Sequence, residues 1–342
     1  MTKEAVQPLA TLQDVADAAG VHRSTASRAL NPDTAHMVAD EVVERIRVHA
    51  QRLGYRRDVV AASLRTKRSR LIGVVVPDIA NPVFGPILSG IETELRANGF
   101  SALVANASVD PEQQIGIVES LVARRVEGIV LATVRQDDPV VTYCLNSGVP
   151  TVLVNRAEAS RRVSAVVSDD LRGLRLAVEH LVALGHRRIG HLAGPLNLST
   201  GALRRQGYEE AMAEAGLSHE IVVEAADAYT REAGRAAAER LLARSSVTAI
   251  ATANDLLALG AYEALAARGL TCPGHVSIVG HNDMPLVDMV SPPLTTIRIG
   301  LKDMGEATAR LLLEQIGGAP KAVTRIVEPE LVVRGSTAPP PS

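Results

Sequence analysis

Arginine and hydroxyl side chains recur along one short segment near the N-terminus. Residues 22–30 read HRSTASRAL, and a helix over them places four polar side chains on one face: Arg23, Ser24, Ser27 and Arg28. A guanidinium can donate two hydrogen bonds to O6 and N7 of guanine, and hydroxyls can bind bases or phosphates. The segment therefore suits a DNA major groove, although the solvated face of an ordinary amphipathic helix has a similar pattern.

A second group of polar residues follows apolar, strand-like runs further along the chain. Asn254 and Asp255 come directly after AIATA at 249–253, and Asn282 ends SIVGHN at 277–282. Open α/β sheets bind ligands at the carboxyl ends of their strands, so these residues predict a small-molecule site. Asp255 also suits the start of a helix, so ligand contact and helix capping both remain open for Asn254 and Asp255.

The segments around residues 22–30 predict a helix-turn-helix. TLQD at 11–14 is a capping signal for a first helix, Gly20 permits the left-handed backbone of a tight turn, and NPD at 31–33 ends the second helix. A third helix over 39–53 stops at Gly54. This ordered set of elements favours DNA binding over a plain solvated face.

From residue 71 the sequence alternates between apolar runs and amphipathic helices. The predicted strands cover 71–77, 101–106, 128–133, 151–155, 188–194, 221–225, 249–253 and 277–282. Strand-helix alternation at this spacing implies right-handed crossovers and doubly wound parallel sheets. The predicted fold class is therefore an N-terminal all-α headpiece joined to a two-lobed α/β core.

Several motifs, in this order, resemble those of the lactose-repressor (LacI/GalR) family of bacterial transcription regulators. They include TLQDVADAAGV at 11–21, LGY at 53–55, AASLRT at 61–66, PDIANP at 77–82, LVALGH at 181–186, ND at 254–255 and LTTI at 294–297. The resemblance covers nearly the whole chain. It implies a helix-turn-helix headpiece, a hinge helix and a core like the periplasmic sugar-binding proteins.

The family pattern divides the recognition helix into two kinds of contact. The resemblance implies base reading by Arg23, Ser24 and Arg28, and mainly phosphate contacts by Thr25, Ser27 and Asn31. His22 stands where the family usually has Ser, and Ala26 stands where it usually has Val. For His22, capping of the helix and contact with a phosphate are both open.

Residues 58–65, DVVAASLR, resemble the hinge helix of the family. Asp58 is a good N-cap, but so short a helix is unstable alone in water, so it can form on DNA and melt when the lobes move. Leu64 matches the leucine that wedges into a minor-groove base step, and Arg65 is placed to neutralise phosphate. The family often has Arg at the position of Ala62.

The resemblance also places a ligand between the two lobes. The ligand contacts that it implies are Phe84, Thr200, Arg204, Tyr229, Asn254, Asp255 and Asn282. Arg204 is predicted at the start of a helix, and Asp169 or Asp170 is a further candidate contact. The family commonly has Asp where Asn282 stands and a second aromatic where Val83 stands. Because Asn donates as well as accepts, a hydrogen-bond pattern unlike that of a common sugar is expected.

These assignments divide the chain into five parts. We expect a disordered tail over 1–9, the DNA-binding domain over 10–57, the hinge helix and linker over 58–70, a ligand-binding and dimerisation core over 71–335, and a disordered tail over 336–342. Within the core, the N-lobe is expected to comprise 71–168 and 300–326. The C-lobe is expected to comprise 169–299 and 327–335.

The charge distribution agrees with DNA binding by one end of the chain. Residues 1–70 hold 12 Lys+Arg and 8 Asp+Glu, a net of +4, and the remainder holds 24 and 30, a net of −6, which together give −2. Two cysteines without a CxxC or Cys/His cluster predict no disulfide framework and no metal site, and no cofactor is expected. MTKEAVQPLA lacks the apolar core of a signal peptide, so a cytoplasmic protein without membrane association is expected.

The sequence therefore predicts a ligand-controlled, sequence-specific repressor that binds a pseudo-palindromic operator as a homodimer. Its expected partners are operator DNA and a small molecule, a sugar or sugar derivative, with a nucleobase or other corepressor as the alternative. An enzyme is disfavoured because the sequence has no GxGxxG after the first strand, Walker A loop, GxSxG or HExxH. A periplasmic sugar receptor is disfavoured by the headpiece.

Overall fold

The computed structural model describes residues 10–31, 34–55, 68–107, 110–318 and 322–341. The chain forms two compact units, a helical headpiece and an α/β core, with the boundary between Ser69 and Arg70. The tail predicted at 1–9 lies outside the described residues. So does the hinge helix predicted at 58–65, with Leu64 and Arg65.

The headpiece consists of short helices around a small apolar core. Its elements are α1 (Leu12–Ala18), α2 (Arg23–Ala29), the 3₁₀ turn η1 (Ala35–Met37) and α3 (Asp40–Arg52). Thr11 caps α1, and the Asp14 carboxylate accepts a hydrogen bond of 2.7 Å from the Thr11 N–H in return. Gly20 has a φ of 62°, which the tight turn between α1 and α2 requires. Ile46 of α3 is fully buried at the centre, so the three helices support one another.

The core contains two six-stranded sheets, one in each lobe. The N-lobe sheet has the order β11-β5-β4-β3-β1-β2 and is parallel throughout. Its strands are β1 (Leu71–Val76), β2 (Ser101–Asn106), β3 (Gly128–Leu131), β4 (Thr151–Val154), β5 (Ser164–Ser168) and β11 (Thr324–Val327).

The C-lobe sheet has the order β12-β10-β9-β8-β6-β7, and β12 alone runs antiparallel to its neighbour. Its strands are β6 (Ile189–Ala193), β7 (Val222–Ala225), β8 (Ala249–Thr252), β9 (Ser277–Asn282), β10 (Thr295–Arg298) and β12 (Glu330–Val332). The predicted fold class, a headpiece and two lobes with doubly wound parallel sheets, is confirmed.

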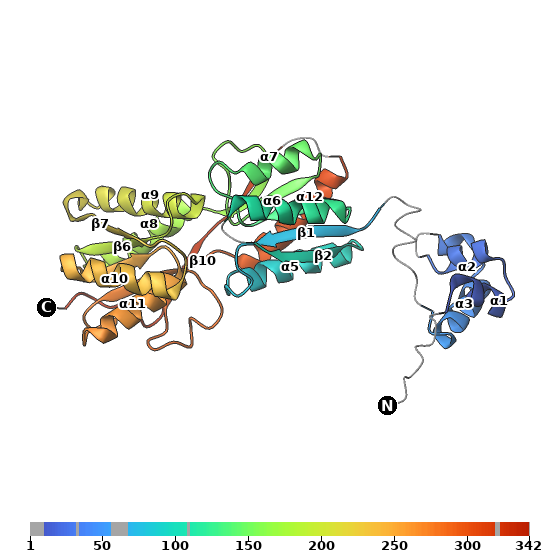
Figure 1. Cartoon of the computed structure of the whole chain (residues 1–342). Helices are drawn as coiled ribbons and strands as arrows, with labels where there is room; N and C mark the ends of the chain where they lie inside the picture. Colours follow the sequence, from blue (N-terminus) through green and yellow to red (C-terminus); the bar gives the residue numbers. More distant parts are fainter. Residues whose placement is uncertain (1–9, 32–33, 56–67, 108–109, 319–321, 342) are drawn as a thin grey trace, which may run out of the picture. The chain divides into compact units, whose positions relative to one another are not determined.

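Helices cover both faces of each sheet (Figure 1). In the N-lobe, α5 (Phe84–Ala97) packs with α12 (Leu301–Ile316), and α6 (Pro111–Ala123) packs with α7 (Pro139–Asn146). In the C-lobe, α8 (Asp170–Ala183) packs with α9 (Ser199–Glu214), and α10 (Arg231–Arg244) packs with α11 (Asp255–Ala267); η2 (Ser218–Glu220) follows α9. The strands between these layers are mostly buried on both faces, which explains their continuous apolar runs.

Three segments of the described chain pass from one lobe to the other. They connect β5 to α8, β10 to α12 and β11 to β12. Gly300, in the second segment, has a left-handed φ of 58° immediately before α12. Such short crossovers at element ends are where hinge motion between lobes is usually absorbed.

The prediction of a disordered C-terminal tail was wrong for residues 336–341. The Ser336 hydroxyl is fully buried, donates to the Ile278 carbonyl at 2.6 Å and accepts from the Thr295 N–H at 2.8 Å. Further along, the His186 imidazole lies 2.8 Å from the carbonyl of Ala338. The tail therefore packs against the C-lobe, because polar groups of that lobe supply partners that its proline-rich composition does not reveal.

The start of α9 also differs from the sequence prediction. The helix begins at Ser199, so Arg204 lies in its second turn and not at its first residue. Thr200 and Arg204 are consequently one helical turn apart on the same face. No helix in the described part of the chain combines the length and apolar character needed to cross a membrane.

Candidate functional site

The exposed face of α2 is the first candidate site. Arg23, Ser24 and Arg28 are exposed on this helix, whereas Ala26 and Ala29 on its other side are buried in the headpiece core. Neither the Arg23 nor the Arg28 guanidinium forms an ion pair or hydrogen bond with another described residue. Two cations are thus available to an external partner.

His22 caps α2, which is one of the two roles that the sequence left open. Its Nδ1 accepts a hydrogen bond of 3.3 Å from the Ser24 N–H and lies 2.8 Å from the Ser24 hydroxyl oxygen. Thr25 and Ser27 are half-buried at the flanks of the exposed face. Asn31 is buried, with 6 % of its surface exposed, so its side chain is far less accessible to DNA than those of the two arginines.

The second candidate site is a pocket between the two lobes of the core. Its lining comes from both lobes and is mainly polar. The lining residues are Asn81, Val83, Phe84, Asn155, Arg156, Thr200, Arg204, Tyr229, Asn254 and Asn282. Most of them follow the carboxyl ends of strands or begin the next helix, the usual location of ligand sites in parallel α/β sheets.

Six of the seven ligand residues predicted from the sequence line this pocket; Asp255 does not. Sequence reasoning missed Asn155 and Arg156, which directly follow β4. The signal that could have found them is present in the sequence, because TVLV at 151–154 is followed at once by a polar pair. Recognising it requires the knowledge that β4 ends beside the pocket.

Arg204 forms a fixed wall of the pocket. Its side chain is buried, its Nε donates to Oδ1 of Asp170 at 2.8 Å, and another guanidinium nitrogen donates to the Ala253 carbonyl at 2.5 Å. His281 Nε2 lies 3.6 Å from the same Asp170 oxygen. Asp170, one of the two further candidates from the sequence, therefore holds Arg204 in place, whereas Asp169 caps α8.

Electrostatics keep this buried cluster in one charge state. Burial alone would raise the pKa of Asp170, but Arg204 and His281 together hold it below its ordinary value. Burial, with the nearby Arg204, lowers the pKa of His281 to about 4. The cluster is therefore a carboxylate–guanidinium pair beside a neutral imidazole at neutral pH.

Two aromatic side chains provide apolar surface in the pocket. The Tyr229 hydroxyl donates to the Thr200 hydroxyl oxygen at 3.1 Å. Its ring lies so close to Gly194 that a Cβ at that glycine would collide with it. Phe84 belongs to the apolar core of the lobe and also lines the pocket, so both roles considered for it from the sequence apply.

Asparagine amides occupy two strand ends and one helix start around the pocket. Asn254 accepts a hydrogen bond of 2.9 Å from the Leu257 N–H and so caps α11 while it lines the pocket. Asn155 and Asn282 have φ values of 65° and 115°, in the left-handed region that Asn tolerates better than most residues. Oδ1 of Asn282 is buried and has no hydrogen-bond partner among the described residues.

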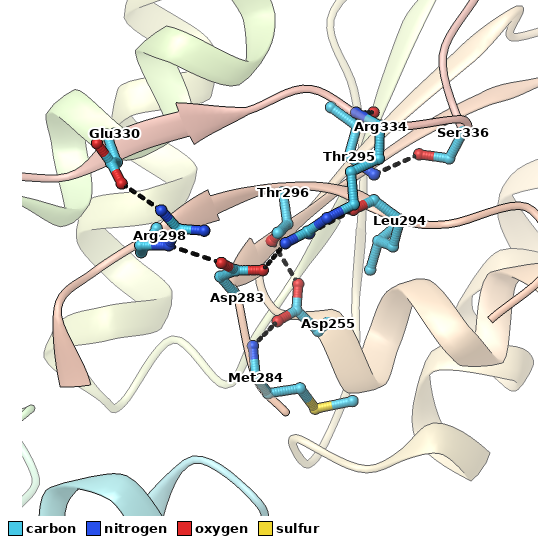
Figure 2. A network of polar contacts seen from close by, with 10 residues as sticks. All are labelled: Asp255, Asp283, Met284, Leu294, Thr295, Thr296, Arg298, Glu330, Arg334 and Ser336. Carbon is cyan, nitrogen blue, oxygen red and sulfur yellow. Dashed lines mark hydrogen bonds and ion pairs between the residues drawn. The ribbon is translucent and has the colours of Figure 1, made fainter. Parts of the chain in front are cut away.

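Asp255 contacts other C-lobe residues and is not part of the pocket lining (Figure 2). Its carboxylate is fully buried and accepts hydrogen bonds from the Met284 N–H at 2.8 Å and the Thr296 hydroxyl at 2.5 Å. Because burial is not offset by a contacting cation, the pKa of Asp255 rises to about 7. The ligand contact expected for Asp255 is thus not seen, since these partners turn the carboxylate away from the pocket lining.

Arg156 differs from Arg204 because it lacks a partner. It is half-buried at the pocket, and its Nε is buried without a hydrogen bond to any described residue. Burial lowers the pKa of Arg156 to about 10, and the charge of Arg204 acts in the same direction. The guanidinium therefore stays protonated at neutral pH.

Comparison with known proteins places the two units in one family. Residues 11–58 match the model of the bacterial regulatory proteins of the lacI family, and residues 178–337 match the periplasmic binding protein-like domain. The chain is 37 % identical over 339 residues to the HTH-type transcriptional regulator MalR of Streptomyces coelicolor, with 96 % of each chain covered. The chain belongs to the lacI family of bacterial regulatory proteins.

Further relatives agree with this placement of the lacI-family chain. It is 33 % identical to the HTH-type transcriptional regulator DegA of Bacillus subtilis, in an alignment that covers 96 % of this chain and 98 % of DegA. Among solved structures, a lac repressor dimer bound to operator and the anti-inducer ONPF is 30 % identical, with a TM-score of 0.85 over 97 % of this chain and 100 % of that chain. A CelR–cellobiose complex is 31 % identical, with a TM-score of 0.72 over 96 % and 99 %.

This lacI-family chain is therefore a DNA-binding transcriptional regulator, as the sequence predicted. The described residues contain no group of three or more side chains that could hold a metal ion. The two candidate sites have distinct chemistry: α2 displays free cations, and the interlobe pocket combines amides, aromatic rings and guanidinium groups.

Proposed function

We propose that this regulator binds a pseudo-palindromic operator as a homodimer and that a carbohydrate in the interlobe pocket changes its affinity for DNA. The observation that carries the proposal is the lining of the pocket. Four Asn side chains line it, and each amide can both donate and accept, as sugar hydroxyls do. The buried, unpartnered Oδ1 of Asn282 favours a ligand that donates a hydrogen bond.

The scarcity of aromatic residues strengthens this proposal. The whole chain has two Phe, five Tyr and no Trp, yet Phe84 and Tyr229 both line this pocket. Aromatic faces complement the apolar faces of sugar rings, while the amides address the hydroxyls. Relatives support the same ligand class: one solved structure is a CelR–cellobiose complex, and a LacI family regulator from Enterococcus faecium, 29 % identical, contains bound ribose.

On the DNA side, we assign base reading to Arg23, Ser24 and Arg28, with phosphate contacts from Thr25 and Ser27. Two copies of α2 in a symmetric dimer would address successive half-sites of the operator. The solved lac repressor dimer on operator supports this arrangement. Ligand binding that changes the angle between the lobes would shift the conformational equilibrium of the segment 58–70. This shift would couple ligand binding in the pocket to DNA binding by the headpiece.

The test begins with the full-length chain and a randomised DNA pool. Selection is expected to yield a two-fold symmetric site, bound by two protein chains per duplex. Fluorescence anisotropy at fixed salt then measures the Kd of that site with and without each sugar that raises the Tm of the protein. A fall in DNA affinity identifies an inducer and a rise identifies a corepressor. Binding without sequence preference, or a bound sugar that leaves the Kd unchanged, would contradict the proposal.

A further inference from the structure

Arg156 is a charged side chain of the pocket that has no counter-charge among the described residues. Its side chain makes no hydrogen bond or ion pair within the described chain, and the titratable groups that act on its charge are Tyr229 and Arg204. By contrast, Arg204 is held by Asp170 at 2.8 Å. Even partly desolvated charges in proteins are normally paired, so the half-buried Arg156 guanidinium at a ligand pocket indicates a partner that arrives from outside.

Three acidic side chains near the pocket have partners other than Arg156. Asp170 serves Arg204, and Asp255 is turned toward Met284 and Thr296. Asp283, directly after β9, receives hydrogen bonds from Arg298 and an ion pair from Arg334, each at 2.7 Å (Figure 2). Two guanidinium groups and no carboxylate line the pocket, and one of the two is neutralised by Asp170. One positive charge therefore remains.

The opposite lobe adds no negative charge to the pocket. At the end of β9 this chain has the neutral Asn282, which lines the pocket. Its buried Oδ1 lacks a donor, so a ligand hydroxyl or another donor would satisfy it. The two unsatisfied groups thus require different chemistry from the ligand: an anionic acceptor at Arg156 and a neutral donor at Asn282.

We propose that the ligand of this pocket is an anionic carbohydrate whose carboxylate or phosphate pairs with Arg156 while its hydroxyls bind Asn282. This inference rests on the proposed carbohydrate function and narrows it. A guanidinium forks onto either type of anion, so the acid group is defined by its charge and oxygen acceptors. In the unliganded protein Arg156 carries a cost in stability that the ligand removes.

The first experiment measures the Tm of the unliganded full-length chain and of Arg156→Gln. Removal of an unpaired, partly desolvated charge is expected to raise the Tm by about 2 °C. The matched control is Arg205→Gln on α9, a half-buried arginine that pairs with Glu209 at 2.7 Å and whose side chain is 41 % exposed, and its Tm should stay near that of the wild type. A Tm for Arg156→Gln several degrees below that of the wild type would show that Arg156 is a structural residue and would overturn the inference.

The second experiment compares matched ligands at equal ionic strength. Glucuronate and galacturonate test the carboxylate, glucose 6-phosphate tests the phosphate, and glucose and galactose are the neutral counterparts. We expect a Tm increase with an acid but not with its neutral counterpart, and about ten- to hundredfold weaker acid binding by Arg156→Gln in calorimetry. Asn282→Asp, which adds a negative charge with little change in volume, should weaken acid binding at least about tenfold.

The outcomes separate this inference from the function on which it rests. Neutral sugars that bind as well as the acids, with no effect of Arg156→Gln, would overturn the anionic ligand and leave a carbohydrate regulator in place. Sulfate that stabilises the protein as strongly as the acids would contradict recognition of the sugar. No Tm change with any sugar would contradict both the inference and the carbohydrate function.

Discussion

Arginine has opposite surroundings in the two units of this chain. Arg23 and Arg28 on α2 are exposed and have no partner among the described residues, whereas Arg204 in the core is 2 % exposed and paired with Asp170. Water solvates the exposed cations, so leaving them free costs little, but the buried cation needs a fixed acceptor. The same side chain therefore serves as an available recognition group on the headpiece and as a rigid wall in the pocket.

The largest effect is expected from Arg204→Met, which removes the buried arginine. It leaves the Asp170 carboxylate buried without its guanidinium, so the free energy of unfolding of the core should fall by about 3–5 kcal/mol. Urea unfolding followed by circular dichroism measures the loss. Arg205→Met, which removes a half-buried, solvent-accessible pair one residue further along α9, should cost no more than about 1 kcal/mol. Equal losses in the two variants would contradict the structural role of the pair.

Asp255→Asn tests a buried carboxylate that has no arginine in contact. The folded-state pKa of Asp255 is raised to about 7, so its contribution to stability is complete when it is protonated, below its unfolded value near 4, and is lost as the pH rises through 7. Asn reproduces the protonated acid, with one acceptor for the Met284 N–H and one donor for the Thr296 hydroxyl. The stability of the variant relative to wild type should therefore increase between pH 4 and pH 8 by up to about 4 kcal/mol.

Denaturant titrations of both proteins at several pH values measure this difference. Asp170→Asn is the contrasting variant, because Arg204 holds the pKa of Asp170 below its ordinary value and favours the ionised form. If the difference in free energy of unfolding between Asp255→Asn and wild type does not change with pH, Asp255 is not the group with the raised pKa.

Arg28→Ala removes one of the two exposed arginines of α2. Loss of a guanidinium that reads a base should weaken binding to the selected operator by about 1–3 kcal/mol and relax the preference at one base pair. Anisotropy titrations on the operator and on a single-base variant at the same salt concentration measure both effects. A uniform loss on every DNA sequence would instead identify Arg28 as a phosphate contact, and stability of the core should be unchanged in either case.

His22→Ala has the smallest expected effect and sharpens the account of how α2 displays its cations. Loss of the side-chain acceptor for the Ser24 N–H should destabilise the headpiece by about 1 kcal/mol. His22→Ser supplies another capping acceptor and should restore most of that stability. Hydrogen exchange of the headpiece amides in the full-length chain measures both variants. If Ser fails to restore protection, the imidazole has a role other than capping.

Local patterns predicted most of the fold. The apolar runs that became β1 to β4 and β6 to β9 were visible in the sequence. Most of these strands are buried on both faces and so carry little polar interruption, whereas the edge strands β2 and β7 are only partly buried. Strand β5 and the strands after Asn282 were not predicted individually, because they are short and their places in the sheets depend on crossovers between lobes. The tail was mispredicted because the partners of Ser336 lie about 40 and 60 residues away in sequence, at Thr295 and Ile278.

The pocket shows the same division between local and long-range information. Motif position predicted Arg204 and Asn282, and both line the pocket. The pairing of Arg204 with Asp170, 34 residues earlier in the chain, follows only from the packing of α8 against α9. Arg156 was missed for a related reason, since its lack of a partner is visible only when every neighbouring carboxylate has been placed.

The central claim is that the pocket and the DNA-binding face are coupled. The most direct measurement is calorimetric titration of the full-length chain with the sugar that raises its Tm, once alone and once saturated with selected operator DNA. Linkage requires operator to change the Kd of the sugar by the same factor as the sugar changes the Kd of operator, and we predict a factor of about five or more. An identical sugar Kd with and without operator would contradict the account.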